Sequence, residues 1–156
     1  MTGGFLFSTL DRVLSWSRSN SLWFFSTGTG CCADELLETY SCRYDLERFG
    51  CVPQVDPRQA DLLIVSGAIS QKAAPFLKQA YESMVSPKYV LAVGACACGG
   101  GPFASNSSYA TTSGAEGVVP VDVFVPGCPP RPEAIMNGLI ALQEKIIGNS
   151  RAKKTH

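Results

Sequence analysis

Cysteines are the residues of this sequence best suited to chemistry, and five of its seven follow turns rich in glycine or proline. Cys31 and Cys32 are adjacent in "TGTGCCADE", Cys96 and Cys98 lie in "GACACGG", and Cys128 lies in "PGCPP". Neighbouring residues of a regular helix or strand point in different directions, but a glycine-rich loop before a helix can direct two thiolates at one object. The glycines also allow the backbone to approach that object closely. We therefore expect a metal centre.

Four thiolates on iron form a 4Fe-4S site, whereas a structural zinc ion more usually has a C-x2-C pair at each half of its site. The adjacent pair and Cys128 supply three of the four ligands, and either Cys96 or Cys98 completes the set. Cys42 and Cys51 lack glycine loops of this kind on both sides, and we interpret them as core residues. An odd number of cysteines also argues against a disulfide framework.

Composition limits the class of protein. A chain of 156 residues is typical of one globular domain. Its 13 basic residues balance 13 acidic ones, so net charge gives no reason to expect a nucleic-acid partner. Only 17% of the residues are charged and 46% are hydrophobic, which is typical of a surface covered in part by other subunits. The opening segment has neither the basic leader of a signal peptide nor an uninterrupted apolar span, so we expect a chain that is not secreted and does not cross a membrane.

Alternating strand and helix patterns predict the fold. Continuous apolar runs that end in glycine predict strands buried on both faces, at residues 60–67, 88–94 and 121–127, with a shorter strand at 50–55. Helical spacing predicts helices at 33–50, 72–85 and 132–147, and an amphipathic helix near the N-terminus. We expect an α/β, flavodoxin-like, doubly wound fold with a mostly parallel sheet and helices on both faces. Ligands of such sheets bind beyond the carboxyl ends of the strands, where Cys96 and Cys128 follow two strands directly.

The chain divides into three segments. Residues 1–30 contain the N-terminal helix and an aromatic interface segment around Trp23, Phe24 and Phe25, residues 31–148 form the α/β iron–sulfur domain, and residues 149–156 form a basic flexible tail. The aromatic residues and the turn at 72–75 form mostly apolar surfaces. We expect them to face a buried ligand cleft or a partner, although aromatic side chains can equally complete the core of the chain itself.

Five segments resemble one known family in sequence and order: "NSLWFFSTGTGCCADE", "RYDLERFG", "DPRQADLLIVSG", "GACACGGG" and "VPVDVFVPGCPPRPEA". The chain resembles the NuoB/PSST/NdhK family, the iron–sulfur subunit beside the quinone site of respiratory complex I, and more distantly the small subunits of membrane-bound nickel–iron hydrogenases. Hydrogenase relatives typically have C-x-x-C where this chain has the adjacent pair. The segment "GAISQKAAP" departs from the "GT-T-KMAP" pattern of the quinone-reducing family, and "CACGGGPF" is closer to the hydrogenase branch.

The resemblance implies a ligand set and a function. It implies that Cys31, Cys32, Cys96 and Cys128 hold one 4Fe-4S cluster, the terminal cluster N2, and that Cys98 is spare. Adjacent ligands also lead us to expect backbone strain at Cys31 and Cys32. The implied function is electron transfer from NADH to quinone, coupled to proton translocation, as a subunit that is not active alone.

The resemblance also implies partners and a location. The quinone would lie in a cleft shared with a 49-kDa-type (NuoD-like) subunit. The other partners would be a two-cluster ferredoxin-like subunit and a membrane-arm subunit of the NuoH type. The location would be peripheral, on the cytoplasmic side of the bacterial inner membrane or the matrix side of the mitochondrial inner membrane.

Four further residues are candidates for proton coupling or quinone binding. Glu35 follows Cys31 by four residues, one helical turn, so its proton could couple to cluster charge. Arg43 could stabilise a reduced cluster or steady an interface, and Asp45 could pair with it. Lys72 belongs to the turn expected to face the quinone. Each of these could instead be an ordinary charged surface residue.

Two other functions remain open. One is the small subunit of a membrane-bound nickel–iron hydrogenase, or of a related oxidoreductase with another acceptor. The other is a zinc-stabilised scaffold without redox activity, which the adjacent cysteine pair disfavours.

Overall fold

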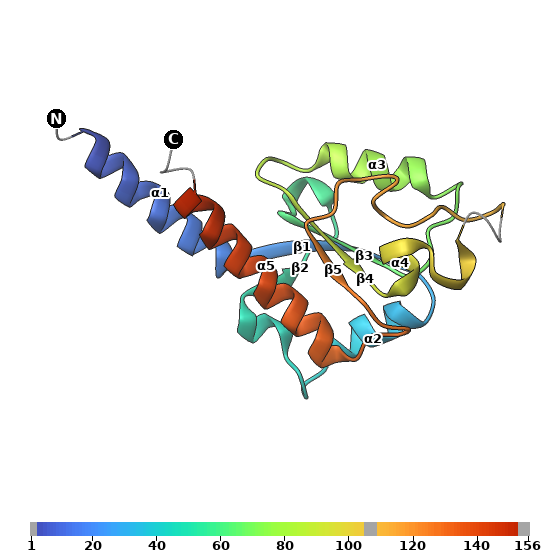
Figure 1. The fold of residues 1–156 in the computed structure, drawn as a ribbon. Coiled ribbons are helices and arrows are strands. Elements are labelled where there is room, and N and C mark those ends of the chain that lie inside the picture. Colours follow the sequence, from blue (N-terminus) through green and yellow to red (C-terminus); the bar gives the residue numbers. More distant parts are fainter. Residues whose placement is uncertain (1–2, 105–108, 153–156) are drawn as a thin grey trace.

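The structure is a computed structural model that describes residues 3–104 and 109–152 (Figure 1). Strands and helices alternate along these residues. The helices are α1 (Gly3–Ser19), α2 (Cys31–Thr39), α3 (Ala74–Ser83), α4 (Ala95–Gly99) and α5 (Pro132–Ala152). The strands are β1 (Leu22–Gly28), β2 (Cys51–Pro53), β3 (Leu62–Ser66), β4 (Tyr89–Val93) and β5 (Val123–Val125), and three short 3-10 helices lie at Leu46–Phe49, Pro57–Gln59 and Gly101–Phe103.

All five strands pair in parallel, in the order β2-β1-β3-β4-β5. This is the flavodoxin-like order, in which the chain reverses its direction of winding between β1 and β3. The expected α/β, doubly wound fold is confirmed. Gly28, Ser66 and Val93 are register partners in β1, β3 and β4, so these three strands end together and their loops meet at one edge.

Each face of the sheet has its own apolar core because side chains alternate along every strand. Leu62 and Ile64 of β3 pack with residues of α2 and α5 on one face. Leu63 and Val65 pack on the opposite face with Leu77 of α3 and Ala97 of α4. Strands buried on both faces explain the unbroken apolar runs in the sequence.

The helices α1 and α5 lie side by side and project together from the α/β body (Figure 1). α1 confirms the expected N-terminal helix, and its exposed apolar residues include Leu10, Val13 and Trp16. α5 reaches Ala152, so residues 149–152 of the segment assigned to a tail are helical, and residues 153–156 lie outside the described residues. No helix of the described residues combines the length and the apolar character needed to cross a membrane.

Two segments differ from the sequence-based expectation. The aromatic residues 23–25 belong to β1, an inner strand of the sheet, rather than to a separate N-terminal segment. The helix expected over 33–50 ends at Thr39. The Tyr40 ring stacks on Phe24, with 5.5 Å between ring centroids, and Asp45 adopts a left-handed φ of 51°, which an α-helix does not tolerate.

Candidate metal centre

Three loops at the carboxyl edge of the sheet carry Cys31, Cys32, Cys96 and Cys128, named here the four-cysteine site. α2 begins at Cys31, directly after Gly30 with a left-handed φ of 64°. The short helix α4 follows Gly94 and contains Cys96. The loop after β5 is fixed to the loop after β4, because Ala95 N–H donates to Gly127 O at 2.7 Å and Gly94 N–H donates to Val125 O at 2.8 Å. Cys128 therefore follows a loop that is bonded to the start of α4.

Glycine is required where the backbone passes the sulfur atoms. A Cβ at Gly94 would lie 2.4 Å from Cys32 Sγ, and the φ of 90° at this residue is itself strained for any side chain. A Cβ at Gly101 would lie 3.3 Å from Cys96 Sγ. The glycines that precede and follow α4 thus leave room for the buried thiols of the site.

The four thiols interact electrostatically as one group. Burial raises the pKa of Cys32 to about 11, and the charges of the other three cysteines of the site and a hydrogen bond with Cys31 contribute to this increase. Burial also raises the pKa of Cys96, with contributions from Cys128 and Cys31. Each additional thiolate makes the next one more costly, so binding all four as thiolates requires a positively charged partner. Iron ions supply that charge.

The donor set fits an iron–sulfur cluster. Four thiols come from three glycine-lined loops, and their environment is soft and sulfur-rich, as such clusters require. Within the described residues, no three His, Cys, Asp or Glu side chains stand close enough together to hold a single metal ion. Cys31 and Cys128 are exposed while Cys32 and Cys96 are buried, so the site opens to one side.

The remaining cysteines are placed differently. The Cys98 thiol donates to the carbonyl oxygens of Ala92 and Val125 at 3.7 and 3.6 Å, which supports a structural role for it. Cys51 is fully buried in the core, as expected. The expectation for Cys42 is wrong, because its side chain is exposed in the turn after α2.

The expected backbone strain at the adjacent cysteines is also absent from this structure. Both residues lie in the first turn of α2, and neither has a positive φ. Gly30 takes up the change of chain direction instead, since its φ of 64° costs glycine little. One thiol of the pair is exposed and the other is buried, yet each interacts with the other.

The four additional candidate residues lie on α2, in the segment after α2, and before α3. Glu35 is half-buried on α2, and Lys72 is exposed before α3. Arg43 is exposed, with its guanidinium 5.6 Å from the centroid of the Tyr44 ring. The expected pairing of Asp45 with Arg43 is not observed, because Asp45 pairs with Arg48 at 3.2 Å one turn later. None of the four contributes to the raised pKa of Cys32 or Cys96.

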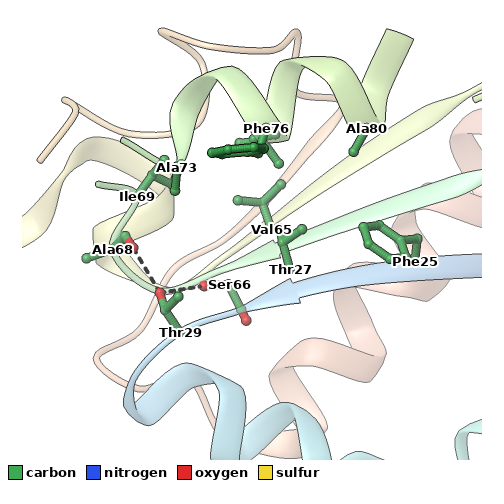
Figure 2. A pocket seen from close by; sticks show the side chains of 11 residues that line it. Phe25, Thr27, Thr29, Val65, Ser66, Ala68, Ile69, Ala73, Phe76 and Ala80 are labelled. Carbon is green, nitrogen blue, oxygen red and sulfur yellow. Dashed lines mark hydrogen bonds between the residues drawn. The ribbon is translucent and has the colours of Figure 1, made fainter. Parts of the chain in front are cut away.

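An apolar pocket of about 220 Å³ lies at the same end of the sheet, on the face covered by α3 (Figure 2). Its polar side chains are hydroxyls alone. Phe25 and Ala73, two of the residues expected to face a cleft, both line it. The full lining is Phe25, Thr27, Thr29, Val65, Ser66, Ala68, Ile69, Ala73, Phe76, Leu77 and Ala80.

The aromatic residues of β1 divide between environments. Phe24 is only 1% exposed and packs in the core on the α2 side, so its expected place in a cleft is wrong. Trp23 is 42% exposed, and Phe25 is half-buried at the pocket. Strand alternation explains the division, because Phe24 points to the face opposite that of its two neighbours.

Two hydroxyl residues of this region were not identified from the sequence. Thr29 donates from Oγ1 to Ala68 O at 2.8 Å, so it joins the cysteine loop to the end of β3 (Figure 2). Ser66 ends β3 with a buried Oγ that has no hydrogen-bond partner among the described residues. Serine and threonine at strand ends are too common for the sequence to single these two out.

Comparisons with known proteins identify the family of this chain. Residues 29–142 match the family model described as NADH ubiquinone oxidoreductase, 20 Kd subunit. The chain is 47% identical to the B subunit of NADH-quinone oxidoreductase from Heliobacterium modesticaldum, over 97% of this chain and 86% of that protein. It is 49% identical to the protein of the same name from Desulfovibrio desulfuricans, over 92% of this chain and 76% of that protein.

Solved structures show the same fold. A chain of the membrane-bound sulfane sulfur reductase, an archaeal respiratory membrane complex, superposes with a TM-score of 0.82 at 39% identity, over 88% of this chain and 76% of that one. A chain of the Ni-Fe-Se hydrogenase from Desulfomicrobium baculatum superposes with a TM-score of 0.59 at 17% identity, over 84% and 65% of the two chains, and this likeness concerns the fold alone. On the family match and the two relatives above, which are both named B subunits of NADH-quinone oxidoreductase, the chain belongs to the family of the 20 kDa subunit of NADH-ubiquinone oxidoreductase.

Proposed function

We propose that this chain is the electron-transfer subunit of a complex I-type NADH:quinone oxidoreductase and that the four-cysteine site holds its terminal 4Fe-4S cluster. The observation that carries the proposal is that the cysteine-bearing loops meet at one edge of the sheet, where Ala95 N–H donates to Gly127 O and so joins the loop of Cys96 to that of Cys128. The cysteines of the site are up to 97 positions apart in the sequence, from 31 to 128, and the parallel sheet brings their loops to one edge. A 4Fe-4S cluster bound there would take up and release one electron at a time.

The chain's own residues have separate tasks in this proposal. Cys32 and Cys96 anchor the cluster from the buried side, while the exposed Cys31 and Cys128 hold it toward a partner. Gly94 keeps the floor of the site free of side-chain atoms. The loops shield the buried half of the site from water, which strengthens the electrostatic influence of every nearby group on it.

The apolar pocket is the proposed contribution of this chain to the quinone site. Its walls are apolar apart from hydroxyls, and none of its lining residues is charged, as a neutral quinone ring requires. Phe25 and Phe76 offer ring faces or edges for packing against that ring. A cavity of about 220 Å³ cannot enclose a ring together with a long isoprenoid tail, so an adjoining 49-kDa-type subunit would complete the cleft.

The proposed assembly places the chain at the junction of the two arms of the complex. Its partners would be the 49-kDa-type subunit, the two-cluster ferredoxin-like subunit and a NuoH-type membrane-arm subunit, and the complex would couple electron transfer to proton translocation. A peripheral position on the cytoplasmic side of the bacterial inner membrane is proposed. The exposed apolar residues of α1 support burial of that helix in an assembly.

The test uses the assembled complex, with the cluster observed by low-temperature electron paramagnetic resonance (EPR). NADH should generate a cluster signal that disappears on addition of quinone, and a quinone-site inhibitor should preserve that signal. A variant with serine at both Cys31 and Cys128 should lack the signal. A signal that NADH generates but that quinone does not discharge would contradict the proposed acceptor while leaving the cluster assignment intact.

A second acceptor deserves the same test. The chain of the sulfane sulfur reductase is 39% identical to this one, and the segment 67–75 departs from the pattern of quinone-reducing relatives. The second candidate is therefore electron transfer to sulfane sulfur in a related respiratory complex. Discharge of the signal by polysulfide, together with no response to quinone, would favour this candidate.

A further inference from the structure

β3 ends in a hydroxyl group that has no hydrogen-bond partner among residues 3–104 and 109–152. Ser66 is 2% exposed, and its Oγ makes no hydrogen bond within the described part of the chain. A buried hydroxyl has lost its hydrogen bonds to water, so an unpaired one is unfavourable. Such a group calls for an explanation, such as a redox role, a bound water molecule or an ion.

The Ser66 side chain points toward the metal side of the sheet. Figure 2 shows the Val65 side chain directed into the apolar pocket and the Ser66 hydroxyl directed the opposite way. Leu62 and Ile64, which alternate with Val65 along β3, pack on this opposite face with residues of α2 and α5. The hydroxyl therefore lies on the face where α2 begins with the adjacent cysteines.

The Ser66 hydroxyl lies near segments that adjoin Cys32. A Cβ at Gly28 would lie 3.1 Å from Ser66 Oγ and 3.0 Å from Cβ of Ala33, the residue after Cys32, so the hydroxyl is close to the first turn of α2. Ser66 also pairs with Val93, and the next residue, Gly94, lies against Cys32 Sγ. Ser66 Oγ therefore lies beside the first turn of α2, which begins with the adjacent cysteines, and it makes no hydrogen bond to Cys32 Sγ among the described residues.

We propose that Ser66 is a positioning residue of the cluster and that its hydroxyl donates a hydrogen bond to the sulfur of Cys32 when the cluster is bound. This inference rests on the proposed function, because it requires the cluster. Cys32 is the buried member of the adjacent pair, so water does not supply the donor there. Serine has one rotatable hydroxyl proton, and that of Ser66 has no acceptor among the described residues.

The consequence concerns the reduction potential. A hydrogen bond to a ligand sulfur stabilises the reduced cluster more than the oxidised one, because reduction adds negative charge to the cluster and its sulfurs. Ser66 should therefore raise the reduction potential and make the cluster a better electron acceptor. A residue that only fills space would leave the potential unchanged.

The experiment is a redox titration of the assembled complex, with the EPR signal recorded at each potential. Ser66→Ala should keep the cluster and shift its midpoint to a more negative potential. Ser66→Thr and Ser66→Val form a matched pair of equal shape, of which the Thr variant should keep the native midpoint and the Val variant should show the negative shift. Ser41→Ala is the control, because it also removes a buried hydroxyl without a partner among the described residues, in the turn after α2.

The outcomes distinguish the role of Ser66 from the proposed function of the chain. An unchanged midpoint in Ser66→Ala, or equal midpoints in the Thr and Val variants, would overturn the role of Ser66 while the cluster remained. If Ser66→Ala fails to assemble, the Thr and Val pair decides the question. A native complex in which mutation of the four-cysteine site affects no cluster signal would instead overturn the proposed function.

Discussion

The two faces of the sheet end differently at the same edge. The face under α2 and α5 ends at the adjacent cysteines of α2 and at the Ser66 hydroxyl, which has no hydrogen-bond partner among the described residues, and Gly94 leaves room for the Cys32 thiol. The face under α3 ends in an apolar pocket whose polar side chains are hydroxyls alone. Thr29 lines that pocket, two residues before Cys31, so the two environments are separated by little more than one strand. Strand alternation allows one edge to present the adjacent cysteines on one face and an apolar pocket on the other.

Substitution of a buried cysteine of the four-cysteine site should have the largest effect on the metal side of the sheet. Cys32→Ser should abolish the low-temperature cluster signal and the NADH:quinone activity, because the hard oxygen of serine replaces the soft thiolate on the buried side. Cys98→Ser should retain both, since the Cys98 thiol donates to carbonyl oxygens of β4 and β5. If Cys98→Ser removes the signal and Cys96→Ser does not, the ligand assignment is wrong.

Adding a side chain at Gly94 should have the second-largest effect on the cluster. Gly94→Ala places a Cβ at a φ of 90° and 2.4 Å from Cys32 Sγ. The backbone conformation alone should cost on the order of 1–3 kcal/mol, and the displaced thiol should reduce cluster content strongly. Iron and acid-labile sulfide per complex provide the measurement.

Gly99→Ala is the matched control for that substitution. Gly99 is also in the segment around Cys96, but a Cβ there would meet no atom within 4 Å and no left-handed φ opposes it. Full cluster content is expected in this variant. Equal losses in the two variants would show that the segment tolerates no alanine, and the contact with Cys32 would then explain nothing.

The Cys51 thiol in the core can be compared with the thiols at the carboxyl edge of the sheet. Burial raises the pKa of Cys51 from 9.0 to about 11, so the native state favours the neutral thiol. The resulting stabilisation is fully present below the unfolded pKa of 9.0 and is lost as the pH rises toward 11, in total about 3 kcal/mol. Denaturant unfolding of the native chain and of Cys51→Ala, across this range, should show a shallower alkaline decline in the variant. Parallel declines would assign the pH dependence to other groups.

Filling the pocket should have the smallest effect and should leave the metal side unchanged. Ala73→Phe adds a ring at the wall of the apolar pocket, and the KM for quinone should rise roughly tenfold, equivalent to about 1.4 kcal/mol of lost binding. The cluster signal and its midpoint should stay native. Ala141→Phe, at an exposed position of α5, is the control for bulk alone. A native KM in Ala73→Phe would exclude this pocket from the quinone site.

Much of this arrangement could be predicted from the sequence. The apolar runs at 60–67, 88–94 and 121–127 predicted three strands because burial on both faces leaves no polar position. The helices at 72–85 and 132–147 followed from their spacing, and the cysteines that follow glycine loops could be assigned to the ligand edge once a parallel sheet was expected. β1 could not be recognised, because "LWFFSTG" mixes aromatic and small polar residues that are equally typical of an interface segment.

The sequence by itself determined the cysteines that could act as ligands, the glycines beside them, and an α/β chain that brings them to one edge. Those properties depend on residue identity and local pattern, which the sequence states directly. Only the tertiary structure decided which atoms share a space, such as Asp45 with Arg48 rather than Arg43, Phe24 with Tyr40, and the Ser66 hydroxyl on the same side as Cys32. Such neighbours depend on strand register and on where each helix ends, and a shift of one residue would turn every side chain of a strand to the other face.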